Sequence, residues 1–134
     1  MGKISRDIAE KEVNGWLDNK KISASKREAK KDNIEVLVCG IMDGELVMNK
    51  DFTITQSLRF PLSESAEGIK QLIYKSRLSV AQTQACLKGV KMTEAYSLIS
   101  SFVAVLTGQH NEAIVCMDSE DFSTAQAIAS FFLP

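Results

Sequence analysis

The stretch FTITQSLRF, residues 52–60, decides the fold class, because its side chains alternate between apolar and polar. A period of two is typical of a β-strand with one buried face. The alternation is broken only at Gln56, and its apolar positions are Phe52, Ile54, Leu58 and Phe60. Pro61 follows and has no N–H to give to a neighbouring strand, so we expect the strand to stop there.

Two further short segments supply partners for this strand. The segment LVM at 46–48 is separated from residues 52–60 by the polar stretch NKD, which predicts a β-hairpin. After a polar loop, KQLIYK at 70–75 predicts another short strand. The sequence therefore predicts a small antiparallel sheet of two or three strands.

The chain before the sheet has the periodicity of helices. Residues 4–19 place apolar side chains at close to helical spacing, and Ser5 is a suitable N-cap. Ser25 and Glu28 match a capping box at the start of a second helical segment. That segment shows an apolar face at i, i+3, i+4 and i+7, although its β-branched residues also favour a strand.

Helices are also predicted after the sheet. One should run from about residue 80 to 87, a longer apolar one should follow it, and a final helix should end the sequence. The expected N-caps are Ser79, Thr93 and either Asp118 or Ser119, and the expected C-terminal glycines are Gly89 and Gly108.

Together these segments predict an α+β fold within one domain-sized chain of 134 residues. Residues 1–44 are expected to form a helical N-terminal arm. Residues 45–134 are expected to form a β-hairpin plus helical domain, in which the small sheet packs with the C-terminal helices.

The final helix carries more apolar side chains than one helix face accommodates. An exposed Phe side chain forfeits about 1.5–3 kcal/mol relative to a buried one, so these residues should pack on the sheet or contact another chain. The candidates for partner contact are Leu98, Phe102, Phe122, Ile128, Phe131, Phe132 and Leu133. For Phe102, Phe122 and Ile128, ordinary core packing is an equal alternative.

Charge is unevenly distributed, although the net charge is only −1. Six Lys or Arg residues lie between positions 20 and 31, and neither residue type occurs after Lys91. These runs indicate solvated faces or partner surfaces. The overall balance is not that of a nucleic-acid-binding protein, and no apolar run is long enough to span a membrane. We expect a cytoplasmic protein.

The sequence offers no group of residues that indicates catalysis or cofactor binding. His110 is the only histidine and has no candidate partner beside it, and the three cysteines form no Cys-x-x-Cys pair. Asp118, Glu120 and Asp121 fit helix capping better than a calcium loop. We expect no enzyme activity, no cofactor and no metal.

The order of four segments resembles a known family. These are FTITQSLRFPL, IKQLIYKSR, EAYSLISSFVAVLTG and MDSEDFSTAQAIASFFL, and the resemblance covers about residues 46–134. They resemble the small tail assembly chaperones of long-tailed bacteriophages, especially contractile-tailed ones. The resemblance implies a protein that binds the tape measure protein and keeps it soluble before the tail tube protein polymerises around it.

The same resemblance implies self-association, a place in the cytoplasm of the bacterial host and absence from the mature virion. The alternative is a permanent structural or adaptor subunit of a phage tail or baseplate. An apolar helix of the partner lying in a groove would suit the first interpretation.

Overall fold

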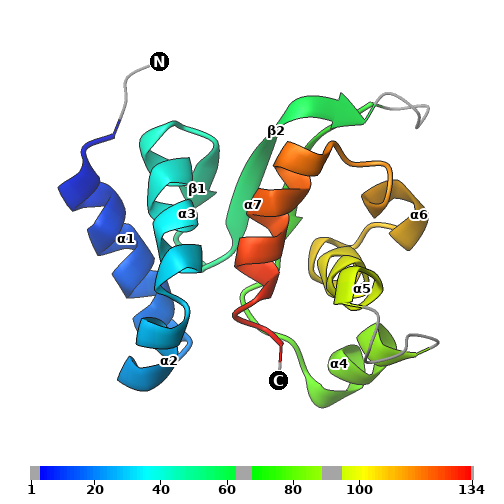
Figure 1. Cartoon of the computed structure of the whole chain (residues 1–134), viewed down its shortest axis with the longest axis horizontal. Helices are drawn as coiled ribbons and strands as arrows, with labels where there is room; N and C mark the ends of the chain where they lie inside the picture. The colour runs from blue at the N-terminus through cyan, green and yellow to red at the C-terminus, as the bar shows by residue number, and fades with distance from the viewer. Residues whose placement is uncertain (1–3, 63–67, 89–94, 134) are drawn as a thin grey trace.

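The computed structural model of the chain describes residues 4–62, 68–88 and 95–133, in which seven helices accompany a three-stranded sheet (Figure 1). The α+β fold class is confirmed. The elements are α1 (Arg6–Asn19), α2 (Ala24–Ala29), α3 (Lys31–Met42), β1 (Leu46–Met48), β2 (Ile54–Leu62), β3 (Ile69–Tyr74), α4 (Val80–Leu87), α5 (Ala95–Thr107), α6 (Asn111–Ile114) and α7 (Ser119–Ala129).

The sheet has the order β1-β2-β3, and both pairs are antiparallel. The predicted hairpin is confirmed, with Leu46 opposite Gln56. The predicted stop at Pro61 is wrong, because β2 continues to Leu62, which pairs with Ile69 across a register shift. Proline is tolerated at position 61 because β1 pairs with β2 only as far as Gln56, so the missing N–H of Pro61 costs no hydrogen bond to β1.

Local capping signals position most helix starts. Ser5 accepts a hydrogen bond from the Ile8 N–H, and Ser79 forms a full capping box with Gln82. The capping box expected at Ser25 is wrong, since the side chain of Ser23 accepts the Lys26 N–H instead and begins a separate short helix, α2. Asp118, not Ser119, caps α7. The stop expected at Gly89 and the cap expected at Thr93 lie outside the described residues.

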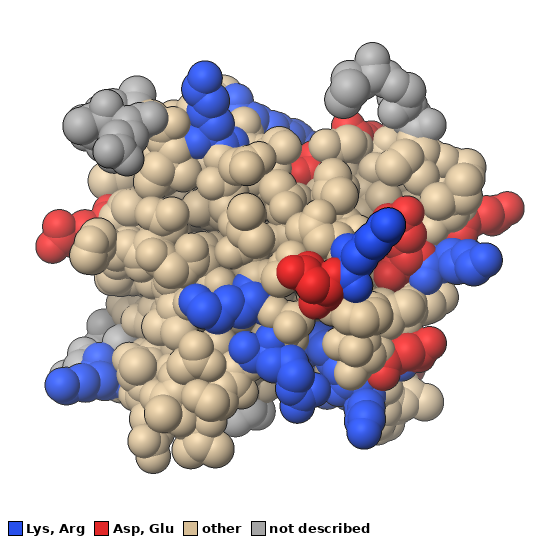
Figure 2. Space-filling view, turned by 180° about the vertical axis from the view of Figure 1, so that it is seen from behind, with Lys and Arg blue, Asp and Glu red and all other residues tan. Residues whose placement is uncertain are grey.

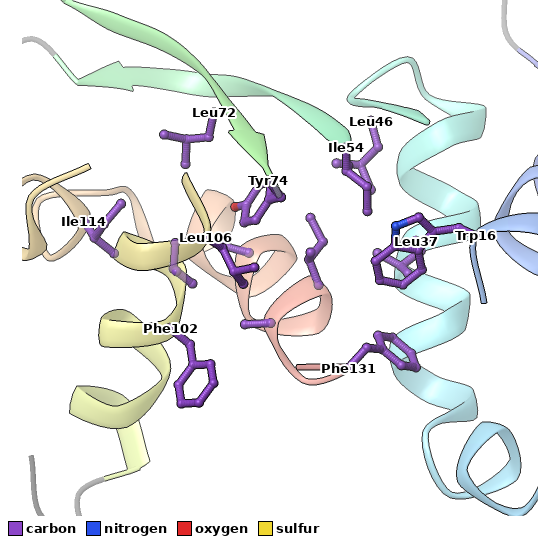
Figure 3. Close-up of a cluster of buried hydrophobic side chains, with 14 of the residues drawn as sticks. Trp16, Leu37, Leu46, Ile54, Leu72, Tyr74, Phe102, Leu106, Ile114 and Phe131 are labelled. Atoms are coloured by element: carbon purple, nitrogen blue, oxygen red, sulfur yellow. The ribbon is translucent and has the colours of Figure 1, made fainter. Parts of the chain in front are cut away.

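The helices of the predicted N-terminal arm contribute side chains to the buried core. Trp16 of α1 and Leu37 of α3 belong to the same buried cluster as Phe102 and Phe131 (Figure 3). The Trp16 indole donates a hydrogen bond of 3.1 Å to the carbonyl of Phe52, at the β1–β2 turn. Helix α7 lies between the N-terminal helices and α5 and contacts both α3 and α5 (Figure 1).

A buried polar network fixes α7 against the sheet. The Asp121 carboxylate, from a fully buried residue, accepts the backbone N–H groups of Arg59 and Phe60, each at 3.0 Å. The Gln56 side chain donates to the Asp121 carbonyl at 3.0 Å and accepts the Tyr74 hydroxyl at 2.6 Å. The irregular part of β2 therefore finds its hydrogen-bond acceptors in a helix instead of a strand.

We predict that Asp121→Ala lowers the free energy of unfolding by about 2–4 kcal/mol, because two N–H groups of β2 lose their acceptor. The matched control is Asp118→Ala, which removes an N-cap from the same helix and should cost about 1 kcal/mol. Urea denaturation followed by circular dichroism measures both. Equal losses in the two variants would show that Asp121 contributes no more than a cap.

Gly40 provides a second test of the packing, at the contact of α3 with β1. A Cβ at this position would lie 2.7 Å from Leu46 Cδ1 and 2.8 Å from Leu46 Cγ, and Leu46 is fully buried. We expect Gly40→Ala to destabilise the fold by about 1–3 kcal/mol through overpacking.

Gly15 in α1 is the control for this substitution, because a Cβ added there would have nothing within 4 Å. Gly15→Ala should stabilise the protein by about 0.5–1 kcal/mol through helix propensity alone. Thermal melts of the two variants should shift in opposite directions. A shift in the same direction would contradict the close approach of α3 to Leu46.

Candidate partner-binding groove

An open groove of about 300 Å³ lies between α5, the segment around α6 and the start of α7. Its walls come from three segments that the fold brings together through the contacts of α5 with α6 and α7. The lining residues are Tyr96, Ser97, Ser100, Ile114, Val115, Met117, Ser119 and Phe122.

Exposed apolar side chains form the rim of this groove. Tyr96 is 74% exposed and Val115 is 63% exposed. The Tyr96 ring stacks on Phe122 with their centroids 6.2 Å apart and their planes inclined by 29°. Part of this stacked aromatic pair is in water, so a partner that covered it would gain the free energy of burying that apolar surface.

The floor of the groove is buried and held in place. Ile114 is 1% exposed and Met117 is 9% exposed, so both anchor the α6 segment in the core. The buried Ser100 donates its hydroxyl to the Ser97 carbonyl at 3.0 Å, which leaves no free hydroxyl hydrogen on Ser100. The groove is therefore preformed, as small binding sites generally are.

Acidic residues border the groove, and one of them, Glu120, is paired with Arg59 at 3.4 Å. The segment 111–122, which builds two of its walls, contains Glu112, Asp118, Glu120 and Asp121 and no Lys or Arg. Asp121 is buried in the contact with β2, whereas Glu112 and Glu120 are exposed. The groove thus combines an apolar floor with acidic surroundings, which favours an apolar ligand that carries positive charge at its edges.

The residues predicted for partner contact do not form one surface. Phe122 lines the groove. Phe102, Ile128 and Phe131 are at most 3% exposed and belong to the core, so the prediction of partner contact is corrected for these three. The remaining ones are partly buried and pack against the core; they are Leu98, Phe132 and Leu133.

Phe131 is buried because α1 provides a wall for it. The Trp16 and Phe131 rings meet edge to face with centroids 5.7 Å apart, and Phe132 lies 6.1 Å from the same indole. The sequence predicts that these side chains pack on the sheet or contact another chain, whereas the structure packs them against Trp16 of α1.

Tyr96 and Val115 line the groove but were not predicted from the sequence. The apolar residues Ile99 and Val103 follow Tyr96 at i+3 and i+7, so the helical period places Tyr96 at the edge of the apolar stripe and does not show that it is exposed. Val115 has no signal in the sequence, because the α6 segment is too short to show a period.

Groups of metal ligands and thiols of lowered pKa are two signs of catalytic chemistry that the described part of the chain can be searched for. No group of three or more His, Cys, Asp and Glu residues there is placed to hold a metal ion. The pKa of the Cys39 thiol is raised chiefly by its hydrogen bond to Glu35, and the pKa of Cys86 is raised by burial. Neither of these thiols is activated as a nucleophile.

Comparisons of the chain with protein-family models, with curated proteins and with solved structures find no match. Within the ranges that the structure describes, no helix combines the length and the apolar character needed to cross a membrane.

We predict that Phe131→Ser lowers the free energy of unfolding by about 3–5 kcal/mol, since it removes a ring packed on Trp16. Leu133→Ser is the control two residues further on, where the side chain is partly exposed, and it should cost about 1 kcal/mol or less. Chemical denaturation measures both. A small loss for Phe131→Ser would make this residue a candidate for partner contact again.

Proposed function

We propose that the protein is a tail assembly chaperone of a long-tailed bacteriophage, which binds the tape measure protein, keeps it soluble and assists assembly of the tail tube. The observation that carries the proposal is the apolar groove with its exposed Tyr96 and stacked Phe122. The ordered segments of residues 46–134 that resemble this family suggest the identity of the partner.

The groove suits one face of an amphipathic helix. Such a helix presents apolar side chains at i, i+3, i+4 and i+7, and one or two of them would enter the space beside Val115 and Phe122. Basic residues on the flanks of that helix would lie near the exposed Glu112. A tape measure protein, being long and helical, offers many such segments.

The size of the groove favours reversible binding, as a chaperone that leaves the finished tail requires. A volume of about 300 Å³ is at the lower end for ligand sites, so each contact should be weak. Several copies along one tape measure chain would then act together through avidity. Self-association and absence from the mature virion are part of the same proposal, as is a place in the host cytoplasm.

A permanent tail or baseplate subunit is the second candidate, and the outer face of the sheet favours it. Val47 is 49% exposed and Ile73 is 50% exposed, and both register with Thr55 across the three strands. Figure 2 shows a broad area without charged side chains on the back of the molecule. A subunit that remains in the particle would bury such a face permanently.

The proposal predicts that co-expression with the tape measure protein raises the soluble fraction of that protein. The double substitution Tyr96→Ser with Val115→Ser should abolish most of this effect, because it removes the exposed rim of the groove. The folding free energy should change by less than about 1 kcal/mol, since both side chains are largely in solvent.

Val80→Ser is the matched control, because Val80 is 76% exposed on α4 and does not line the groove. Tape measure protein that stays equally soluble with and without the chain would overturn the chaperone proposal. Mass spectrometry of purified particles separates the two candidates, since only the structural subunit should be found there.

A further inference from the structure

A second, smaller hollow of about 140 Å³ lies at the other end of α7. It lies between the end of α1, the segment before α4, α4 itself and the turn that follows α7. The residues that line it are Lys20, Arg77, Leu78, Thr83, Phe131 and Phe132. It shares no residue with the apolar groove.

Aromatic rings hold Lys20 in place within this hollow. Its ammonium nitrogen lies 3.5 Å from the centroid of the Phe132 ring and 5.5 Å from that of Trp16. The same nitrogen donates a long hydrogen bond of 3.4 Å to the Ser76 carbonyl. Cation–π contacts with Phe132 and Trp16 position the charge, but they provide no anion to neutralise it.

The positive charges at this hollow have no carboxylate partner among the described residues. None of the ion pairs among the described residues involves Lys20 or Arg77. Lys26 adds a third positive charge nearby, and Figure 2 shows Lys and Arg side chains gathered on the lower half of the back face.

The pKa of Lys20 is lowered to about 8, chiefly by burial and to a smaller extent by repulsion from Arg77 and Lys26. Its ammonium group is therefore still largely charged at neutral pH, but it is charged at a cost that a bound anion would offset. Thr83 adds a hydroxyl to the lining of the hollow.

We propose that this hollow binds a small oxyanion, a carboxylate or a phosphate group, between Lys20 and Arg77. The Arg77 guanidinium can engage two oxygens side by side, and the Lys20 ammonium provides a point charge. The Thr83 hydroxyl can donate to a remaining oxygen. A volume of about 140 Å³ accommodates such a group but not a whole nucleotide, so the site recognises the anionic group itself.

This inference does not depend on the chaperone proposal, because it rests on a different set of residues. The oxyanion could belong to an acidic side chain of a protein partner or be free phosphate in solution. Both present the same chemistry to Lys20 and Arg77, and the choice between them is an outcome of the test.

The test is a titration of the full chain, labelled with ¹⁵N, with sodium phosphate and separately with sodium acetate at pH 7. Each is compared with sodium chloride at the same ionic strength. We expect saturable shifts in the signals of Arg77 and Thr83. Arg77→Gln should weaken binding about tenfold or more, since it removes a charge-assisted contact.

Lys20→Gln should weaken binding similarly, but it alters a partly buried contact. Arg77 is exposed, so Arg77→Gln tests binding without a change in the stability of the fold. Lys50→Gln is the control, because Lys50 is exposed in the β1–β2 turn and should leave the affinity unchanged.

Binding of phosphate alone would assign the site to phosphate groups, and binding of both anions would extend it to the carboxylates of a partner protein; either supports the proposal. Identical shifts with chloride, or an Arg77→Gln variant that binds as tightly as the original chain, would overturn it.

Discussion

The position of α7 is the constraint on which the rest of the structure depends, and the Asp121 carboxylate sets it. Apolar contacts alone would let a helix slide along a sheet, because they have no direction. A buried carboxylate is stable only where donors meet it, and the N–H groups of Arg59 and Phe60 are those donors. Gln56 adds a bond to the backbone of the same residue. With its axial position fixed, α7 presents one side to α3 and another to α5.

Local signals were sufficient to predict the elements, but the assembly depends on pairs that are far apart in the sequence. Ser5, Ser79 and the β1–β2 hairpin each act within a few residues, so their patterns are visible in the sequence. Asp121 looks like an ordinary acidic residue in the first turn of a helix, and its donors lie 62 and 61 positions earlier. No periodicity links the two. An even longer separation lies between Trp16 and Phe131, so no local pattern predicts that the N-terminal helices pack against the C-terminal segment.

The candidate site was only partly predictable for a related reason. An apolar stripe identifies the side of a helix that is buried, but it does not say whether the cover comes from the same chain. Phe102, Ile128 and Phe131 find that cover within the chain, whereas Phe122 is only partly covered. The exposed rim is made by Tyr96, at the edge of an apolar stripe, and by Val115, in a segment too short to show a period. The helical period alone therefore does not identify the residues of the rim.

Helix α7 keeps the acidic and the basic parts of the sequence apart in space. Phe122 near its start borders the acidic groove, and Phe132 beyond its end borders the basic hollow. A helix rises by about 1.5 Å per residue, so the helical part from Phe122 to Ala129 separates the two sites by roughly 10 Å. The arrangement also follows the helix dipole, which favours Asp118 and Glu120 at the start and Lys20 near the end. The two sites share no lining residue, and the buried hydrogen bonds of Asp121 fix the helix between them to the sheet.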